Sequence, residues 1–191
     1  MEKLDIYNHA LAGLGIPRVS SETENDQVKV LGSLFNIVLD EALVEAPWTF
    51  ATWIQQLAAP SDIDNDTSYD YIFSLPVDPY CLEPQMILDS DGAEYPSEPF
   101  LIMKRYLFTD KSEVYLRYTI RPDDLNEWSP MFGIFMAYLL AAKGSMAMKF
   151  SDEVEARMYV LAERYRVKAI IAEGRKKFYD STGVSLITKN R

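Results

Sequence analysis

The feature that most limits the fold of this chain is the apolar run MFGIFMAYLLAA at residues 131–142. Ser129 and Pro130 precede it, and this pair is typical of a helix start, with Ser as the N-cap and Pro at the first helical position. The run is apolar nearly all round, as in a helix enclosed by other helices. It is too short to cross a membrane and ends at Lys143. The sequence therefore predicts the central helix of a bundle.

Two helices are predicted before this central helix. The first covers about residues 2–13 and stops at the glycines and proline of GLGIP. The second opens at Ser21, where Glu24 three residues later completes the pattern of a capping box. From there apolar residues recur at helical spacing to about Ala46, which gives the helix one apolar face.

A fourth helix is predicted to open at Ser151 and to end near Arg175, Lys176 and Lys177. Acids in its first turns and bases in its last turns suit the helix dipole. At about 1.5 Å per residue it reaches about 40 Å, which is longer than a small bundle needs. The remaining tail, 178–191, is mildly apolar and is expected to need a partner or the protein body to be ordered.

The middle of the chain, residues 57–121, has strand rather than helix patterns. EVYLRYTI at 113–120 is the clearest strand because it is rich in aromatic and β-branched residues. We expect one small antiparallel sheet of three or four short strands. The predicted fold is mainly α, an α+β arrangement of about four helices with a β-rich insertion. Its domains are a bundle (1–56 and 122–177), the insertion (57–121) and the tail.

An aromatic corner interrupts the second helix. Pro47 lacks an N–H and disfavours helix at the residue before it, so the chain has to turn there. Trp48, Phe50 and Trp53 follow within six residues. Because aromatic side chains bury large areas, we interpret Pro47, Trp48, Phe50 and Trp53 as a structural corner packed on the bundle.

The charge of the chain is negative and uneven. The net charge is −10, which argues against a protein that binds nucleic acid by neutralising phosphates. Between Ser20 and Glu98 the one basic residue is Lys29, whereas residues 157–178 are rich in Arg and Lys. An acidic body with a basic end is suited to a complementary partner or to another copy of the chain.

Few residues of the chain are candidates for chemistry. Cys81 and His9 are the only residues of their types, so neither predicts a disulfide or a metal site, and each is interpreted as structural. Asp62, Asp64 and Asp66 have the spacing of the first three ligands of a calcium loop, but Gly at the sixth position and Glu at the twelfth are missing. No phosphate loop or nucleophile elbow occurs. We expect no catalytic, cofactor or metal residues and no enzyme.

The N-terminus has no basic region followed by an apolar core, so no signal peptide is predicted and the protein is expected inside a cell.

The order of the motifs is more informative than any one of them. A first helix ends in an LGIPRVS turn, a long helix ends in PWTFA, and a Leu-Pro-x-Asp element, a small strand region, an SP helix start and two long helices follow. This order resembles the head-to-tail adaptor family of short-tailed phages, also called tail tubular protein A or tail accessory factor. The resemblance covers about residues 4–175. Its motif positions are Leu14, Gly15, Pro17, Val19 and Ser20, then Pro47, Trp48, Phe50 and Ala51, then Leu75, Pro76 and Asp78.

The resemblance implies a virion structural protein at the portal–tail junction, assembled in the host cytoplasm. Members of the family form a ring, typically of twelve copies, beneath the portal protein. The ring extends the channel through which DNA passes without specific binding, and it carries the tail nozzle or tube. Partners would thus be the chain itself, the portal and the tail, with no membrane and no cofactor.

Two groups of charged residues are the candidate contacts in such a ring. Expected portal contacts are Arg164, Arg166, Lys168, Arg175, Lys176 and Lys177. Expected acids facing the channel or a neighbouring subunit are Asp62, Asp64, Asp66 and Asp70. The alternatives are a head–tail connector of another phage type, a non-viral helical module that binds an acidic partner, and a wall-degrading enzyme of the tail.

Overall fold

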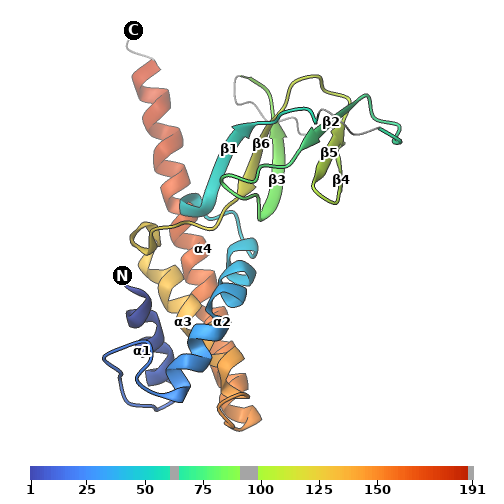
Figure 1. Ribbon diagram of the computed structural model, residues 1–191. Coiled ribbons are helices and arrows are strands. Elements are labelled where there is room, and N and C mark those ends of the chain that lie inside the picture. The colour runs from blue at the N-terminus through green and yellow to red at the C-terminus, as the bar shows by residue number, and fades with distance from the viewer. Residues whose placement is uncertain (61–64, 91–98, 189–191) are drawn as a thin grey trace. The chain divides into compact units, whose positions relative to one another are not determined.

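The computed structural model describes residues 1–60, 65–90 and 99–188 (Figure 1). It divides into two compact units, one formed by Met1–Phe50 with Pro122–Arg191 and the other by Ala51–Arg121. The first is a helical bundle and the second a β unit, so the fold is α+β with about four helices, as predicted. The boundary expected between residues 56 and 57 lies between 50 and 51 instead, because residues 52–56 form a strand.

The bundle is built around α3 (Pro130–Ser145), as the apolar run predicted. Ser129 is its N-cap and its side chain accepts a hydrogen bond from the backbone N–H of Phe132 at 3.2 Å. α3 contacts α1 (Lys3–Gly13), α2 (Asp26–Val44) and α4 (Asp152–Thr188). Most of its side chains are buried, so its apolar character all round is explained by helices on several sides.

α2 begins later than expected. Its N-cap is Asn25 rather than Ser21, and the Asn25 side chain accepts a hydrogen bond from the N–H of Val28 at 2.8 Å. Glu24 does reach back, but its carboxylate accepts from the N–H and the hydroxyl of Ser20. The predicted capping box is therefore wrong, since these residues close a turn ahead of the helix and an Asn cap satisfies the first amides.

α4 is much longer than expected. It was predicted to end near residues 175–177, but its backbone remains helical to Thr188 and includes most of the segment expected to be a tail. No proline occurs after Pro130, and Gly174 and Gly183 do not end the helix. With 37 residues against 16 in α3, it spans about 55 Å where α3 spans about 24 Å.

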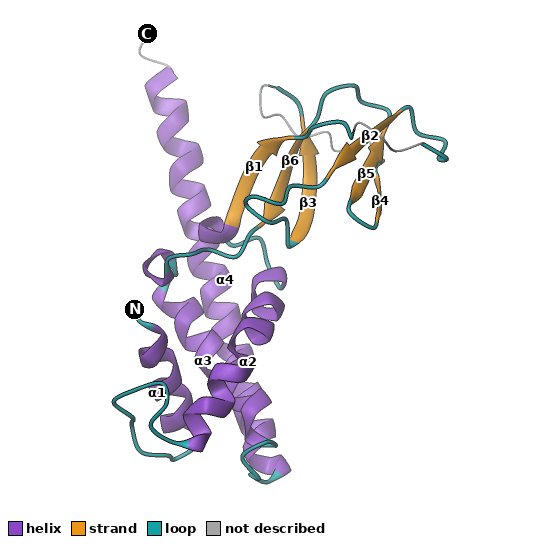
Figure 2. Cartoon of the chain, in the orientation of Figure 1, coloured by secondary structure: helices purple, strands orange, loops and turns teal. Residues whose placement is uncertain are grey.

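The β unit contains two three-stranded antiparallel sheets rather than the single sheet that was expected (Figure 2). One has the order β1-β6-β3, from Thr52–Gln56, Tyr115–Thr119 and Glu83–Leu88. The other has the order β2-β5-β4, from Tyr71–Ser74, Tyr106–Thr109 and Leu101–Met103.

A single hydrophobic core serves both sheets of the β unit. The clearest predicted strand, 113–120, contains β6, which lies at the centre of its sheet between β1 and β3. Leu116 and Tyr118 of β6 share one core with Phe73 of β2 and Leu107 of β5. Pro84 lies in β3, an edge strand, where its missing N–H costs no ladder bond.

Candidate interaction surfaces

The aromatic corner is a buried junction of the bundle. Trp48 is fully buried, and its indole N–H donates to the carbonyl of Ala42 at 2.9 Å. Its ring lies 4.9 Å from the ring of Phe132, and Phe50 lies at the same centroid distance from Phe132. Trp128 also packs on Phe132, at 5.0 Å. The end of α2 is thus fixed to the start of α3 by stacked and edge-on rings.

Trp53 does not belong to this corner. It lies in β1, in the β unit, and 48% of its surface is exposed. The sequence interpretation placed it with Trp48 because the two are close in the chain. The interpretation missed the strand that starts at Thr52. Pro47 lies at the turn before the corner and is exposed to solvent.

Glu173 ties α4 to the same corner, and the sequence did not single it out. Its side chain is only 3% exposed, and its carboxylate accepts hydrogen bonds from the backbone N–H of Thr49 at 3.1 Å and from the Thr49 hydroxyl. These bonds give a buried carboxyl group the partners that a buried polar group needs. The one signal in the sequence was an acid inside a segment otherwise rich in bases.

α4 continues for fifteen residues beyond Glu173. Among α4 residues with described side chains, which extend to Gly174, Glu173 is the last that is buried. In Figure 1 the helix runs on past the ends of α1, α2 and α3 of the same unit. We call residues 174–188 the overhang. Arg175, Lys176 and Lys177 lie on it, but their side chains are outside the part that the structure describes.

The other basic residues expected at a portal lie on the packed part of α4. Arg166 donates to both carboxylate oxygens of Glu163 at 2.7 Å and lies 3.5 Å from Glu45, the C-cap of α2. The hydrogen bonds to Glu163 raise the pKa of Arg166 and lower that of Glu163. Lys168 lies over the ring of Tyr165 at 4.6 Å, and Arg164 is exposed. The structure therefore engages Arg166 within the bundle and leaves Arg164 at the surface.

Of the four predicted acids, Asp62 and Asp64 lie outside the described residues. Asp66 and Asp70 are both exposed, on the loop that leads into β2. This loop is organised by Asn65, whose side chain accepts from the N–H of Thr67 at 3.1 Å and donates to the carbonyl of Tyr69 at 2.6 Å. No group of three metal-ligand side chains occurs among the residues that the structure describes.

His9 and Cys81 have structural surroundings. His9 packs edge-on against Tyr138 at 5.1 Å, and burial lowers the pKa of its imidazole. Cys81 is buried in the core of the β unit, where burial raises the pKa of its thiol to about 11. A thiol with so high a pKa is a poor nucleophile at neutral pH.

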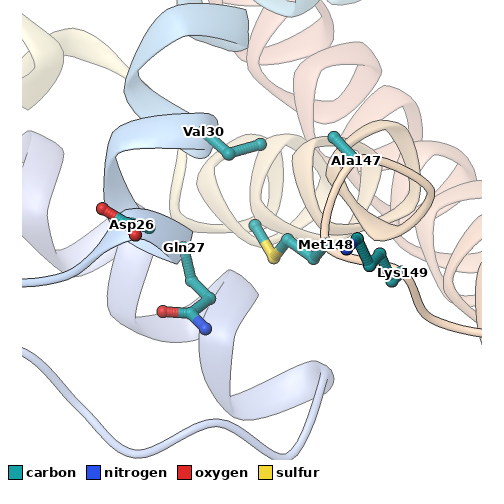
Figure 3. Close-up of a pocket in the computed structure, with 6 residues that line it drawn as sticks. All are labelled: Asp26, Gln27, Val30, Ala147, Met148 and Lys149. Carbon is teal, nitrogen blue, oxygen red and sulfur yellow. The ribbon is translucent and has the colours of Figure 1, made fainter.

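Two hollows on the bundle are shallow and open. One, of about 320 Å³, lies between the first turn of α2 and the turn that joins α3 to α4 (Figure 3). Its lining combines Val30 and Met148 with Asp26 and Lys149. The other, of about 210 Å³, has Phe135 and Leu139 of α3 among its lining, with charged residues of α2 and α4 beside them. Both hollows therefore combine apolar and charged side chains.

Comparison with known proteins adds no family. No family model and no curated protein matches the chain. No helix among the residues described in the structure has both the length and the apolar character to span a membrane.

Proposed function

We propose that this protein is a virion structural protein, a head-to-tail adaptor that forms a ring beneath the portal of a short-tailed phage. The observation that carries the proposal is the overhang of α4. The helix is anchored to its own bundle at Glu173 and then extends fifteen residues further. A helix in this position offers a second protein a docking element without disturbing the bundle.

The composition of the overhang supports docking on a partner. Its sequence, GRKKFYDSTGVSLIT, contains two glycines and four β-branched residues, all of them weak helix formers. Isolated helices of about 12–15 residues are marginal in water even when rich in alanine. Because helix propensity is low in this segment, contacts with a partner would stabilise it, as docking on the portal requires.

The motif order described above points to the portal as that partner. In the adaptor family the partner above the ring is the portal, so we assign Arg175, Lys176 and Lys177 of the overhang to the portal contact. Exposed acids such as Asp66 and Asp70, with a net charge of −10, suit a channel that lets DNA pass, because like charges repel phosphate. The proposed protein performs no catalysis, and its activity is assembly.

The proposal is tested by the mass of the complex. The purified protein is mixed with the portal ring of the same virus, and the mass is measured by light scattering. A single large complex with about twelve copies per portal is the expected result for an adaptor ring. Two separate masses at every mixing ratio, with both proteins folded, would rule the proposal out.

A further inference from the structure

α4 exposes a row of aliphatic side chains that the bundle does not use. Val160 is 69% exposed, Val167 45% and Ile171 51%. The opposite side of the same helix is buried through Met158, Ala162 and Ala169, among others. The helix thus has an inner face that the bundle covers and an outer row, here called the α4 stripe, that remains in solvent.

α2 has a corresponding row. Ile37 is 68% exposed and Val44 46%, and Val30 is half-buried on the same side of the helix. Residues 30, 37 and 44 are seven apart, as are 160 and 167. Since seven residues are close to two helical turns, each set lines one face of its helix. We call residues 30, 37 and 44 the α2 stripe.

The charges beside the two stripes are opposite in sign. Residues 36–45, in α2 and its C-cap, contain Asp40, Glu41 and Glu45 and no base. Residues 157–168 of α4 contain four bases and one acid, namely Arg157, Arg164, Arg166, Lys168 and Glu163.

Pairs within the chain engage the acids beside the α2 stripe, Asp40, Glu41 and Glu45, and one of the bases beside the α4 stripe. Glu41 lies 2.9 Å from Lys143, while Arg166 is shared by Glu163 and Glu45. With Arg166 counted against Glu163, three bases still flank the α4 stripe.

We propose that the α4 stripe of one copy packs against the α2 stripe of a second copy. Both surfaces are aliphatic rows on helices, so they are suited to helix–helix packing, and their flanking charges favour the pairing of unlike faces. Each chain carries one stripe of each kind, so the contact joins two different faces and repeats from copy to copy. The inference rests on the proposed adaptor function for one point, that the repeat closes into a ring.

Cross-linking between two variants tests the contact directly. Ile37→Cys protein is mixed with Val167→Cys protein and oxidised at high protein concentration. The native Cys81 is buried, so it does not interfere. We expect a mixed disulfide dimer, with little product from either variant alone, because the contact is between unlike faces. Cysteines at Glu22 and Val77, which are exposed and belong to neither stripe, serve as the control pair. Equal cross-linking by the control pair, or no mixed dimer, would overturn the inference.

A second measurement uses a change of polarity. Val167→Asp places a carboxylate in the α4 stripe and is expected to weaken self-association by about tenfold or more. Val77→Asp, at a valine that is 74% exposed in the β unit, is the matched control and should leave association unchanged. Association is followed by sedimentation, and equal behaviour of the two variants would contradict the assigned faces.

Portal binding separates this inference from the proposed function. A Val167→Asp protein that loses self-association but still binds the portal supports both. If the protein self-associates through the stripes but does not bind the portal, the contact between copies is supported and the adaptor function is rejected. If the protein binds the portal and the Val167→Asp variant self-associates as strongly as the wild type, the adaptor function is kept and the proposed contact between stripes is rejected.

Discussion

The two parts of α4 differ in what stabilises them. Residues 152–173 lie against α3, bury Met158, Ala162 and Ala169, and end at the Glu173–Thr49 hydrogen bonds. The overhang, 174–188, continues the same helix past that anchor. The first part is specified by the core of its own chain, whereas the second part carries the weak helix formers. The comparison shows how one helix serves both as a bundle member and as an extension toward a partner.

Removal of the overhang gives the largest expected effect. A chain that ends at Gly174 keeps the Glu173 anchor. Its free energy of unfolding should therefore differ from that of the full chain by no more than about 0.5 kcal/mol. It should form no complex with the portal ring in light scattering. Full portal binding by the shortened chain would show that the packed part of α4, or another element, makes the contact.

Trp48→Ala tests the core that holds the packed part. Truncation of a fully buried Trp costs about 3–5 kcal/mol, and the hydrogen bond to Ala42 is lost as well. The loss is measured by urea unfolding. Trp53→Ala is the matched control, since Trp53 is half-exposed and should cost far less. Equal losses would mean that the corner at Trp48 is not the main support of the bundle.

Glu173→Ala sharpens the boundary between the two parts. The change removes a buried acceptor and leaves the Thr49 N–H without it, for a loss of about 1–3 kcal/mol. The free energy of unfolding is again the readout. Glu163→Ala, ten residues earlier and exposed, is its control. A loss below that of the control would place the end of the packed part elsewhere.

Arg166→Ala should have the smallest effect. Its pair with Glu163 is exposed on the acid's side, and exposed ion pairs contribute about 0–1 kcal/mol. Added salt should reduce even this difference, since it screens surface charges. A loss of several kcal/mol would show that Arg166 holds α2 to α4 through Glu45 more tightly than its 3.5 Å distance indicates.

The sequence predicted the bundle better than the β unit for a physical reason. The start of α3 is a local signal, since Ser129 and Pro130 act within one turn, and the apolar run identifies a helix enclosed by others. β1 was missed because its pairing with β6 joins residues 59 to 67 positions apart. No residue near Thr52 in the sequence indicates that β6 is the partner strand. The spacing of the aromatic residues was therefore interpreted as a corner that continues to Trp53.

The candidate surfaces were predictable only in part. The basic character of 164–177 was evident, but not that Arg166 is engaged by Glu163. The burial of Glu173 could not be predicted from the residues around it, because it depends on Thr49, which is 124 positions away. The stripes were hidden as well: Val160 and Val167 fit the helical spacing of a core, and only the fold shows that they lie on its outer side. The end of α4 was misplaced because a cluster of bases is typical of a last turn.

The most direct test of the account is amide hydrogen exchange along α4, in the free protein and in the complex with the portal ring. The account predicts slow exchange through residues 154–173 in both states. Residues 174–188 should exchange fast in the free protein and become protected in the complex. Protection of 174–188 that is unchanged by the portal, whether high or low in both states, would contradict the claim that the overhang is the docking element.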